Sequence, residues 1–420
     1  MMKTLTVTIF AAAALVLGAC RENREEGYRD RTETNDWIVA TMSDHYFWNG
    51  SMRTDANRYA TPDIFFGNVL TRNGNGGRAD TFSFIDTEGD TGRLGEVTPG
   101  YGLEFYTTTV EGRALAARVL FVYPGSPAER AGIRRGEWIT EVNGIKLTES
   151  NIGLLRNGGA MSVTRAACGF DEVNEAYVWT NTDTVGVETA DFMPATPFAC
   201  DTTYDIEGRR VGYVKLNSCH ASGQHDAELR RVAAEMDGCD ELVVDLRYCS
   251  RGDIAFAAGF ASMLVEEGMA DSTFVTKTYN DNHADNDSTV AFGNAAGTHL
   301  GLRGLYVIAD EGTGGEFETL ANGLRGRIVT TFVGQATAGS NAILGRFVCP
   351  SYPQYVIYPV VAAWVAPDED VDCFRPIQPN LEVEERTNDI ATYAAIGDTA
   401  EVMLHSAIDV IVNGLPVATE

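Results

Sequence analysis

The sequence predicts a multidomain α+β protein with a small helical segment first, a β-rich module next and an α/β core last. Three observations lead to this fold class. Apolar residues recur at helical spacing between residues 35 and 85. Short β-rich runs with glycine and proline turns follow between residues 99 and 165. From Tyr204 onward strand and helix patterns alternate, which is typical of α/β layering with parallel strands.

The composition is that of a globular protein with a sizeable core. The chain has 420 residues, of which 44% are hydrophobic and 22% are charged. Its 59 acidic and 32 basic residues give a net charge of −27. No basic block is present that could neutralise phosphates, so we expect no nucleic-acid partner. The negative charge is expected to serve solubility.

The first residues predict an export signal. Lys3 precedes an apolar run over residues 5–17, and the letters LGAC stand at 17–20. These four letters resemble a bacterial lipobox, which implies cleavage before Cys20 and lipidation of its thiol. The alternative is an ordinary signal peptide with a chance cysteine. We expect an exported protein anchored by lipid to a bacterial membrane, on its periplasmic or cell-surface face.

The patterns divide the chain into six segments. The predicted segments are a signal peptide (1–19), a lipidated tether (20–34), a helical N-terminal segment (35–95), a β module (96–165), a connection with some strand pairing (166–203) and an α/β core (204–415). Within the core, residues 276–287 are polar and predict a surface loop. Residues 398–413 predict a closing helix that stops at Gly414.

Seven of the eight cysteines lie after Cys20, an odd number that leaves at least one thiol without an intramolecular partner. Cys349 and Cys373 flank an apolar run at 355–365 and form our predicted disulfide, because an exported protein can hold such bonds. No Cys-x-x-Cys spacing suggests a metal site. No phosphate-binding Gly-x-x-x-x-Gly-Lys-[Ser/Thr] motif is present either. We expect neither a metal nor a cofactor.

The α/β core is organised around a strand, a glycine turn and a helix. Residues 305–309 predict the strand, and Gly312, Gly314 and Gly315 allow a sharp turn after it. Apolar residues at helical spacing predict a helix over 316–325. Such a turn is suited to a nucleophile, because the side chain is exposed and backbone N–H groups converge on it. Here the turn carries Gly315 and no nucleophile.

A pattern of spaced residues surrounds this turn: Glu318, Asn-Gly-Leu at 322–324, Gly334, Thr337 and Gly339. The pattern resembles the catalytic segment of the C-terminal processing peptidases, also called tail-specific proteases, which use a Ser–Lys dyad. Carried over by position, the family's serine falls on Gly315 and its lysine on Ser340. The resemblance implies a peptidase core of the crotonase or ClpP type in which both dyad residues are replaced.

A second family motif begins with Asp-Leu-Arg at 245–247, and the residues after it depart from the family pattern. Cys249 stands for an asparagine, Arg251 stands for the first glycine of a pair, and Gly252 keeps the second. In the family this turn helps to build the oxyanion hole through a backbone N–H. The turn from Cys249 through Ser250 and Arg251 to Gly252 is therefore a third candidate catalytic element that is altered.

The β module carries the letters PGSPAERAGI at 124–133 and GEWITEVNG at 136–144. With these letters it resembles a PDZ domain, which binds peptides by adding them to a sheet edge while backbone N–H groups hold the terminal carboxylate. The resemblance places the carboxylate-binding loop on Tyr101, Gly102, Leu103, Glu104 and Phe105. Polypeptide or protein C-termini are the expected partners. The alternative is a scaffold whose groove is closed or empty.

Three classes of function remain. The first is an exported lipoprotein of the C-terminal processing serine peptidase family that is a catalytically inactive pseudopeptidase and binds polypeptide C-termini or a partner protein. The second is an active serine-type endopeptidase with a rearranged site. Its candidate nucleophiles and bases are Ser340, Thr313, Ser250, Lys215, His220 and His225. A third, weaker class is a structural or nutrient-capture lipoprotein.

Overall fold

The structure, a computed structural model, describes residues 28–74, 77–87, 99–111, 113–194, 196–217, 225–250, 252–367, 373–385 and 393–416. The predicted signal peptide and Cys20 lie outside these residues. The chain divides into two compact units. Unit 1 holds the described residues of Met1–Glu96, Thr276–Ser288 and Ala342–Val365. Unit 2 holds those of Val97–Val275, Thr289–Asn341 and Ala366–Glu420.

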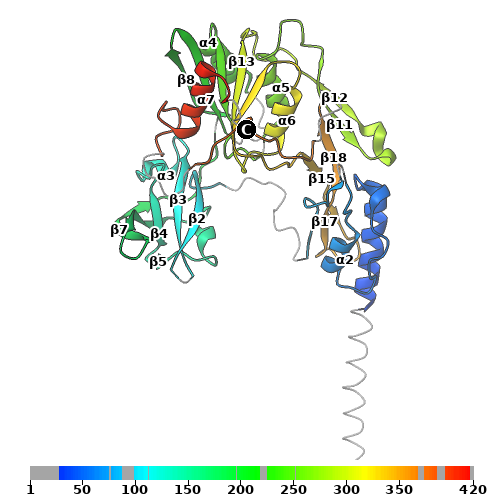
Figure 1. Cartoon of the computed structure of the whole chain (residues 1–420). Helices are drawn as coiled ribbons and strands as arrows, with labels where there is room; N and C mark the ends of the chain where they lie inside the picture. Colours follow the sequence, from blue (N-terminus) through cyan, green and yellow to red (C-terminus); the bar gives the residue numbers. More distant parts are fainter. Residues whose placement is uncertain are drawn as a thin grey trace, which may run out of the picture. The chain divides into compact units, whose positions relative to one another are not determined.

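Unit 2 contains the α/β core, which is built on a six-stranded sheet (Figure 1). In sheet order the strands are β19 (Leu381–Glu382), β14 (Thr330–Gly334), β13 (Gly304–Ala309), β10 (Glu241–Asp245), β9 (Arg209–Leu216) and β8 (Phe198–Ile206). Neighbouring strands from β19 to β9 run parallel, and only β8 is antiparallel to its neighbour. The expected alternation of strand and helix is therefore present.

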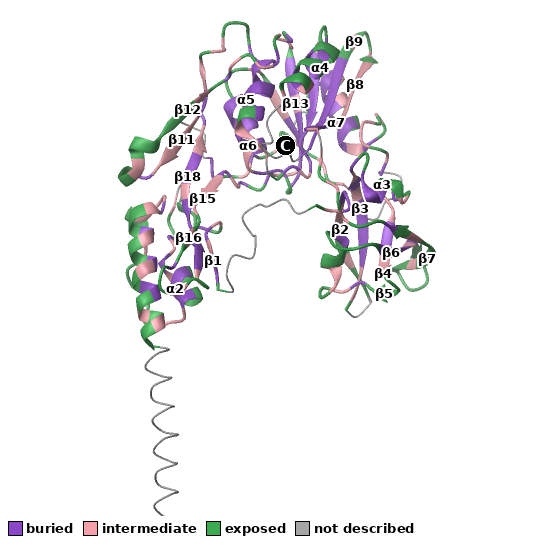
Figure 2. Cartoon of the chain, turned by 180° about the vertical axis from the view of Figure 1, so that it is seen from behind, coloured by how far each residue is buried: buried purple, intermediate pink, exposed green. Residues whose placement is uncertain are grey.

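Helices cover both faces of this sheet. Their bounds are α4 (Asp226–Met236), α5 (Ile254–Ser262), α6 (Glu316–Gly323) and α7 (Val402–Asn413). Helix α7 lies across the sheet from α5 and α6 (Figure 2). Its Met403, Leu404 and Ala407 pack against Val243 and Ile308 of the sheet. This apolar layer fixes the strand ends that carry the candidate site.

Helix α7 begins later than the sequence predicts. The predicted start was residue 398, but Asp398 accepts a hydrogen bond from the N–H of Ala400 at 2.9 Å and belongs to a turn. Glu401 is the N-cap residue, because its side chain accepts from the N–H of Leu404 at 3.1 Å. Gly414 ends the helix with φ 79°, as predicted.

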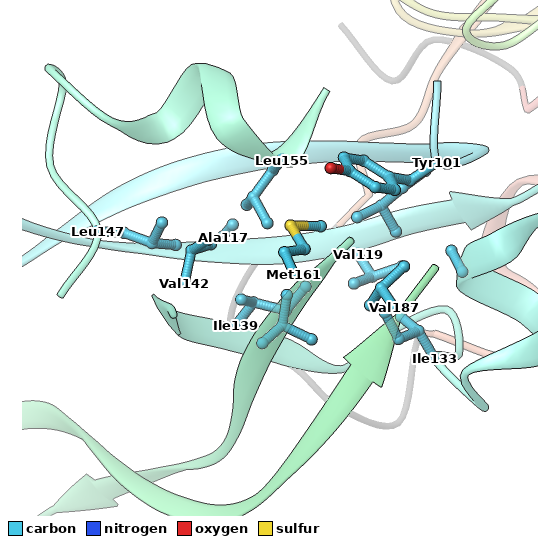
Figure 3. Packing of buried hydrophobic residues seen from close by; sticks show 13 residues of the cluster. Tyr101, Ala117, Val119, Ile133, Ile139, Val142, Leu147, Leu155, Met161 and Val187 are labelled. Atoms are coloured by element: carbon cyan, nitrogen blue, oxygen red, sulfur yellow. The ribbon is translucent and has the colours of Figure 1, made fainter. Parts of the chain in front are cut away.

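The PDZ-like module of unit 2 is an antiparallel sheet of order β2-β3-β4-β6-β7, with β5 beside β4. Its elements are β2 (Leu103–Glu111), β3 (Ala114–Val122), α3 (Pro127–Arg130), β4 (Trp138–Val142), β5 (Ile145–Lys146), η3 (Ile152–Leu155), β6 (Met161–Asp171) and β7 (Ala176–Val187). Figure 3 shows its apolar core, in which Val119, Ile139 and Met161 pack together. The segment 166–203, expected to be a connection, holds the end of β6, all of β7 and the start of β8.

Unit 1 combines helices with short strands from distant parts of the chain. Residues 28–45 are helical. The remaining elements are η1 (Asn49–Ser51), α2 (Pro62–Val69), β1 (Phe84–Asp86), η4 (Asp281–Asn286), β15 (Ala342–Leu344), β16 (Phe347–Val348), β17 (Val356–Tyr358) and β18 (Val360–Val365). Strand β11 (Thr273–Tyr279) belongs to this unit from Thr276 onward, and β12 (Ser288–Ala291) belongs to it only at Ser288. Strand β17 lies between β1 and β16, and β18 lies between β11 and β15.

Two sequence predictions fail in these segments. Residues 276–287 were expected to be a surface loop, but they contain the end of β11 and all of η4. The β-branched and aromatic residues of β11 suit a strand, and residues 276–279 pair with β18. The predicted Cys349–Cys373 disulfide is also wrong, because Cys349 holds a free, buried thiol. Among the described helices, none has the length and apolar character needed to cross a membrane.

Candidate functional site

The candidate site centres on the turn between β13 and α6. Strand β13 ends at Ala309, and α6 begins at Glu316. Gly315 is the N-cap residue, with φ 56° and ψ −129°. This left-handed backbone is strained for residues with a side chain and is accessible to glycine. The N–H of Gly314 donates to the carbonyl of Cys249 at 2.9 Å, which joins the turn to the one that follows β10.

Glu318 connects α6 to the turn that follows β14. Its buried carboxylate accepts hydrogen bonds from the N–H groups of Gly339 and Ser340, each at 2.7 Å, and from the hydroxyl of Thr337. Burial raises the pKa of Glu318, and the hydrogen bonds that it accepts oppose this rise. The residue therefore fixes the position of Ser340 relative to the first turn of α6.

The two positions that the sequence predicts to correspond to the family's dyad lie together. The N–H of Gly315 donates to the hydroxyl oxygen of Ser340 at 3.3 Å. A Cβ atom added at Gly314 would collide with the same hydroxyl. Glycine supplies no nucleophile, and a serine hydroxyl is not a base near neutral pH. The place where a nucleophile and a base would meet therefore holds neither.

The other candidate nucleophiles and bases lie in different environments. Thr313 is buried, and its hydroxyl donates to the carbonyl of Leu246 at 2.9 Å. Ser250 is exposed in the turn after β10. His225 precedes α4 and packs its ring edge-on to another aromatic ring at 5.6 Å. His220 lies outside the described residues. Ser250 is the accessible hydroxyl of this group.

The turn after β10, the candidate oxyanion element, is held by several contacts. Cys249 points inward, and its thiol donates to the carbonyl of Leu216 at 3.1 Å. Burial raises the pKa of this thiol to about 12. The N–H of Gly252 donates to a carboxylate oxygen of Glu316 at 3.0 Å. Arg251 lies outside the described residues. A backbone donor in this turn is thus already used by an anion.

Lys215 is buried beside the same turn and is 1% exposed. Its ammonium donates to the carbonyls of Leu216 at 2.6 Å and of Arg247 at 2.7 Å. It also lies 3.6 Å from the sulfur of Cys249 and 5.5 Å from the ring centroid of Phe121. The positive charge of Lys215 is stabilised by the two backbone carbonyls and by the face of the aromatic ring. Lys215 therefore has a structural environment rather than that of a base facing a substrate.

A buried ion-pair network lies behind the oxyanion turn, and the sequence did not reveal it. Arg247 bonds to Asp245 at 2.6 Å, to Glu385 at 2.6 Å and to Glu401 at 2.8 Å. Arg135 of the PDZ-like module joins the two glutamates at 2.9 and 3.1 Å. Burial alone would raise the pKa of Asp245, but Arg247 and the other cationic and hydrogen-bonding partners hold that pKa at about 2. The network fixes the strand end to α7.

The predicted carboxylate-binding loop is well anchored. The carbonyl of Tyr101 accepts from the N–H of Ala128 at 3.0 Å. Gly102 has φ 72°, and a Cβ atom there would collide with Ser126. The carbonyl of Gly102 accepts from the N–H of Tyr123 at 3.0 Å. The loop therefore needs glycine at position 102, and its shape is fixed by the turn into α3.

Strand β2 follows this loop and lies at the edge of its sheet. Leu103 pairs with Val122 of β3, and no other described strand pairs with β2. The guanidinium of Arg156 lies 5.1 Å from the ring centroid of Phe105. Glu104 is half-buried, and burial raises the pKa of its carboxyl group. An edge strand of this kind can accept a further strand.

Three segments of the chain match models of known protein families. Residues 210–383 match the model for peptidase family S41, residues 33–84 match the peptidase S41 N-terminal domain, and residues 118–156 match a PDZ domain. The carboxyl-terminal-processing protease of Synechocystis sp. is 24% identical over 301 residues, which cover 70% of this chain and 64% of that protein. The protein of the same name from Picosynechococcus sp. is 24% identical over 303 residues, 71% and 68% of the two chains.

Solved structures agree in fold. A Bacteroides fragilis structure, provisionally assigned as an S41 protease, has a TM-score of 0.70 at 24% identity and covers 90% of this chain and 97% of that chain. The photosystem II D1 C-terminal processing protease has a TM-score of 0.51 at 18% identity, with 89% and 99% covered. The sequence prediction of N-terminal helices, a PDZ-like module and a peptidase-type core is confirmed. The chain belongs to peptidase family S41, the C-terminal processing peptidases.

Proposed function

We propose that this chain is an exported, lipid-anchored member of family S41 that does not cleave peptide bonds and instead binds polypeptide C-termini. One observation carries the loss of activity. The N–H of Gly315 donates to the hydroxyl of Ser340 at 3.3 Å, so the two dyad positions are adjacent while nucleophile and base are both missing.

The contacts of the oxyanion turn support the same conclusion. An oxyanion hole requires free N–H donors aimed at the developing negative charge. In this chain the N–H of Gly252 donates to Glu316, whose carboxylate would repel such a charge. Lys215, the nearest candidate for a relocated base, donates to two backbone carbonyls. Loss of the dyad and alteration of the turn are separate changes that act in the same direction.

The PDZ-like module supports retained binding. Its loop from Tyr101 to Phe105 is held by backbone hydrogen bonds, and β2 has an unpaired edge among the described strands. An added peptide strand would bond to this edge while the loop's N–H groups met its carboxylate. The lipobox-like letters at 17–20 support anchoring to a bacterial membrane.

Catalysis is tested by degradation of an unstructured protein substrate. We expect the native chain to be inert and the double substitution Gly315→Ser with Ser340→Lys to cleave. The matched control is Gly315→Ala with Ser340→Lys, which adds the base without a nucleophile and should stay inert. Cleavage by the native chain would refute the proposal. If the double substitution is also inert, Glu316→Ala is added, because alanine has no side-chain acceptor for the N–H of Gly252.

The alternative, an active endopeptidase with a rearranged site, draws on the exposure of Ser250. If the native chain cleaves, single alanine substitutions at Ser250, Ser340 and Thr313 identify the nucleophile. Loss of cleavage in one of them, with the other two unaffected, would establish this alternative. We expect instead that the native chain shows no cleavage.

Binding is tested with fluorescent peptides that end in a free or an amidated C-terminus. We expect saturable binding of the free form and at least tenfold weaker binding of the amidated form. Gly102→Ala should abolish the preference, because its methyl group would displace the loop. Gly125→Ala is the matched control, since Gly125 also has a positive φ, of 77°, but has no atom within 4 Å of the added group. Equal binding of both peptides would contradict the proposal.

A further inference from the structure

Unit 1 contains two histidines and an aspartate whose side chains meet. Asp44 and His45 end the first helical stretch, and His283 lies in η4. One potential ligand atom from each of the three residues lies within 4.8 Å of the others. Among the described residues, it is the one group of three or more His, Cys, Asp or Glu side chains close enough together to hold a metal ion. Its members are far apart in the sequence, so no local spacing reveals it.

The distances between the donor atoms are short. Nε2 of His283 lies 3.3 Å from one oxygen of Asp44, and Nε2 of His45 lies 3.5 Å from the other. Nε2 of His283 is buried and makes no hydrogen bond. The two imidazole rings are stacked, with centroids 4.6 Å apart and planes inclined by 11°. A buried ring nitrogen that faces a carboxylate without a hydrogen bond is available to a cation.

The surrounding structure holds the three residues in place. The side-chain amide of Asn280 donates to the carbonyls of Asp44 and Tyr46, each at 2.8 Å. The amide of Asn282 donates to the carbonyl of Ser43 at 3.1 Å. The ring of Phe347 stacks on His45, with centroids 4.6 Å apart. Both segments are therefore fixed to each other by groups that take no part in ligation.

We propose that Asp44, His45 and His283 bind one divalent transition-metal ion of the Zn²⁺, Ni²⁺ or Cu²⁺ class. Imidazole nitrogen with carboxylate oxygen suits these ions better than Ca²⁺ or Mg²⁺, which prefer oxygen ligands alone. Ligands about 2.0–2.1 Å from a tetrahedral ion lie roughly 3.3 Å from each other. The two carboxylate–imidazole distances are close to this value.

Binding requires one local adjustment. The ion must lie near the plane of each imidazole, so the stacked rings must rotate out of parallel. The terminal torsion of a histidine is broad and permits this rotation at small cost. The side chains of Asp44, His45 and His283 are 56%, 33% and 24% exposed, which leaves room for water in the remaining coordination position. The bound ion would fasten η4 to the first helical stretch.

The test is titration of the metal-free full chain with Zn²⁺ against a chromophoric chelator, followed by Co²⁺, whose visible absorption reports its ligands. We expect one equivalent to bind. His283→Gln and His45→Gln should each weaken binding at least tenfold, because each removes one ligand. His405→Gln, which removes an exposed histidine of α7, is the control and should leave binding unchanged.

A second readout separates ligation from folding. Saturating Zn²⁺ should raise the melting temperature of the native chain and of the His405→Gln variant by the same amount, because the ion binds the folded state. The increase should vanish in His283→Gln, while its circular dichroism without metal stays native. Absence of saturable binding, or equal binding in the His45, His283 and His405 variants, would overturn the proposal.

Discussion

The backbone N–H of Gly315 and the hydroxyl of Ser340 form a hydrogen bond of 3.3 Å between the two turns of the candidate site. The bond joins the N-cap of α6 to the turn after β14. It also means that Ser340 is held by a backbone group rather than by a catalytic partner. The two turns of the candidate site are thus joined directly by this bond.

The backbone at Gly315 gives a stability prediction. At φ 56° a side chain adds strain, so Gly315→Ser should lower the free energy of unfolding by about 1–2 kcal/mol. Urea denaturation measures the change. The control is Gly67→Ser on the exposed surface of α2, where the added Cβ meets no atom within 4 Å. If Gly315→Ser costs no more than Gly67→Ser, the turn is not strained.

Glu401 has two roles that predict a large effect of its loss. It caps α7 through the N–H of Leu404, and it bonds to Arg247 and Arg135 while fully buried. Glu401→Gln should destabilise unit 2 by about 3–5 kcal/mol, because it removes one of the carboxylates that neutralise two buried cations. Asp398→Asn, in the turn just before, is the control and should cost less than about 1 kcal/mol. Thermal unfolding followed by circular dichroism distinguishes them.

Glu104 predicts a dependence of stability on pH. Burial raises its pKa, and Arg156, Tyr123 and Lys215 oppose the rise. A carboxyl group with a raised pKa contributes fully to stability below its unfolded pKa of about 4.3, and this contribution is lost as the pH rises through the folded value. Glu104→Gln should therefore raise the melting temperature at pH 7.5 but not at pH 4.

The matched control for this substitution is Glu149→Gln, which changes an exposed glutamate of the same module. It should leave the melting temperature unchanged at both pH values. An equal or lower melting temperature for Glu104→Gln at pH 7.5 would show that the charged carboxylate is stabilised by its neighbours.

Cys249 should resist alkylation in the folded chain. With a pKa of about 12 the thiol is ionised in roughly one molecule in ten thousand at pH 8, and the thiolate is the reactive form. Mass spectrometry after brief iodoacetamide treatment should find Cys249 unlabelled and fully labelled only after denaturation. Labelling of Cys249 as fast as the half-buried Cys200 would show that the turn opens readily.

The sequence predicts best where local patterns decide the structure. Helix α6 begins at the predicted residue, Glu316, because its apolar face at Phe317, Leu320 and Ala321 has clear helical spacing. Strand β11 was missed because it lies between β12 and β18, and the pairing of its polar residues 276–279 comes from β18, far along the chain. The same holds for Arg135, whose partners Glu385 and Glu401 are also remote. Long-range pairing leaves no periodicity that a local reading can detect.

The discontinuity of unit 1 bears on the order in which the chain can fold. Strand β1 pairs with β17, Phe84 opposite Tyr358, so its partner is synthesised long after it. During synthesis, which proceeds from the N-terminus, β1 has no partner strand until β17 has been made. Unit 1 is complete only when residue 365 has been added. During that interval an open strand edge is available to other chains. Correct folding of this protein therefore calls for a chaperone, or for rapid completion of the chain, until the third stretch of unit 1 has been synthesised.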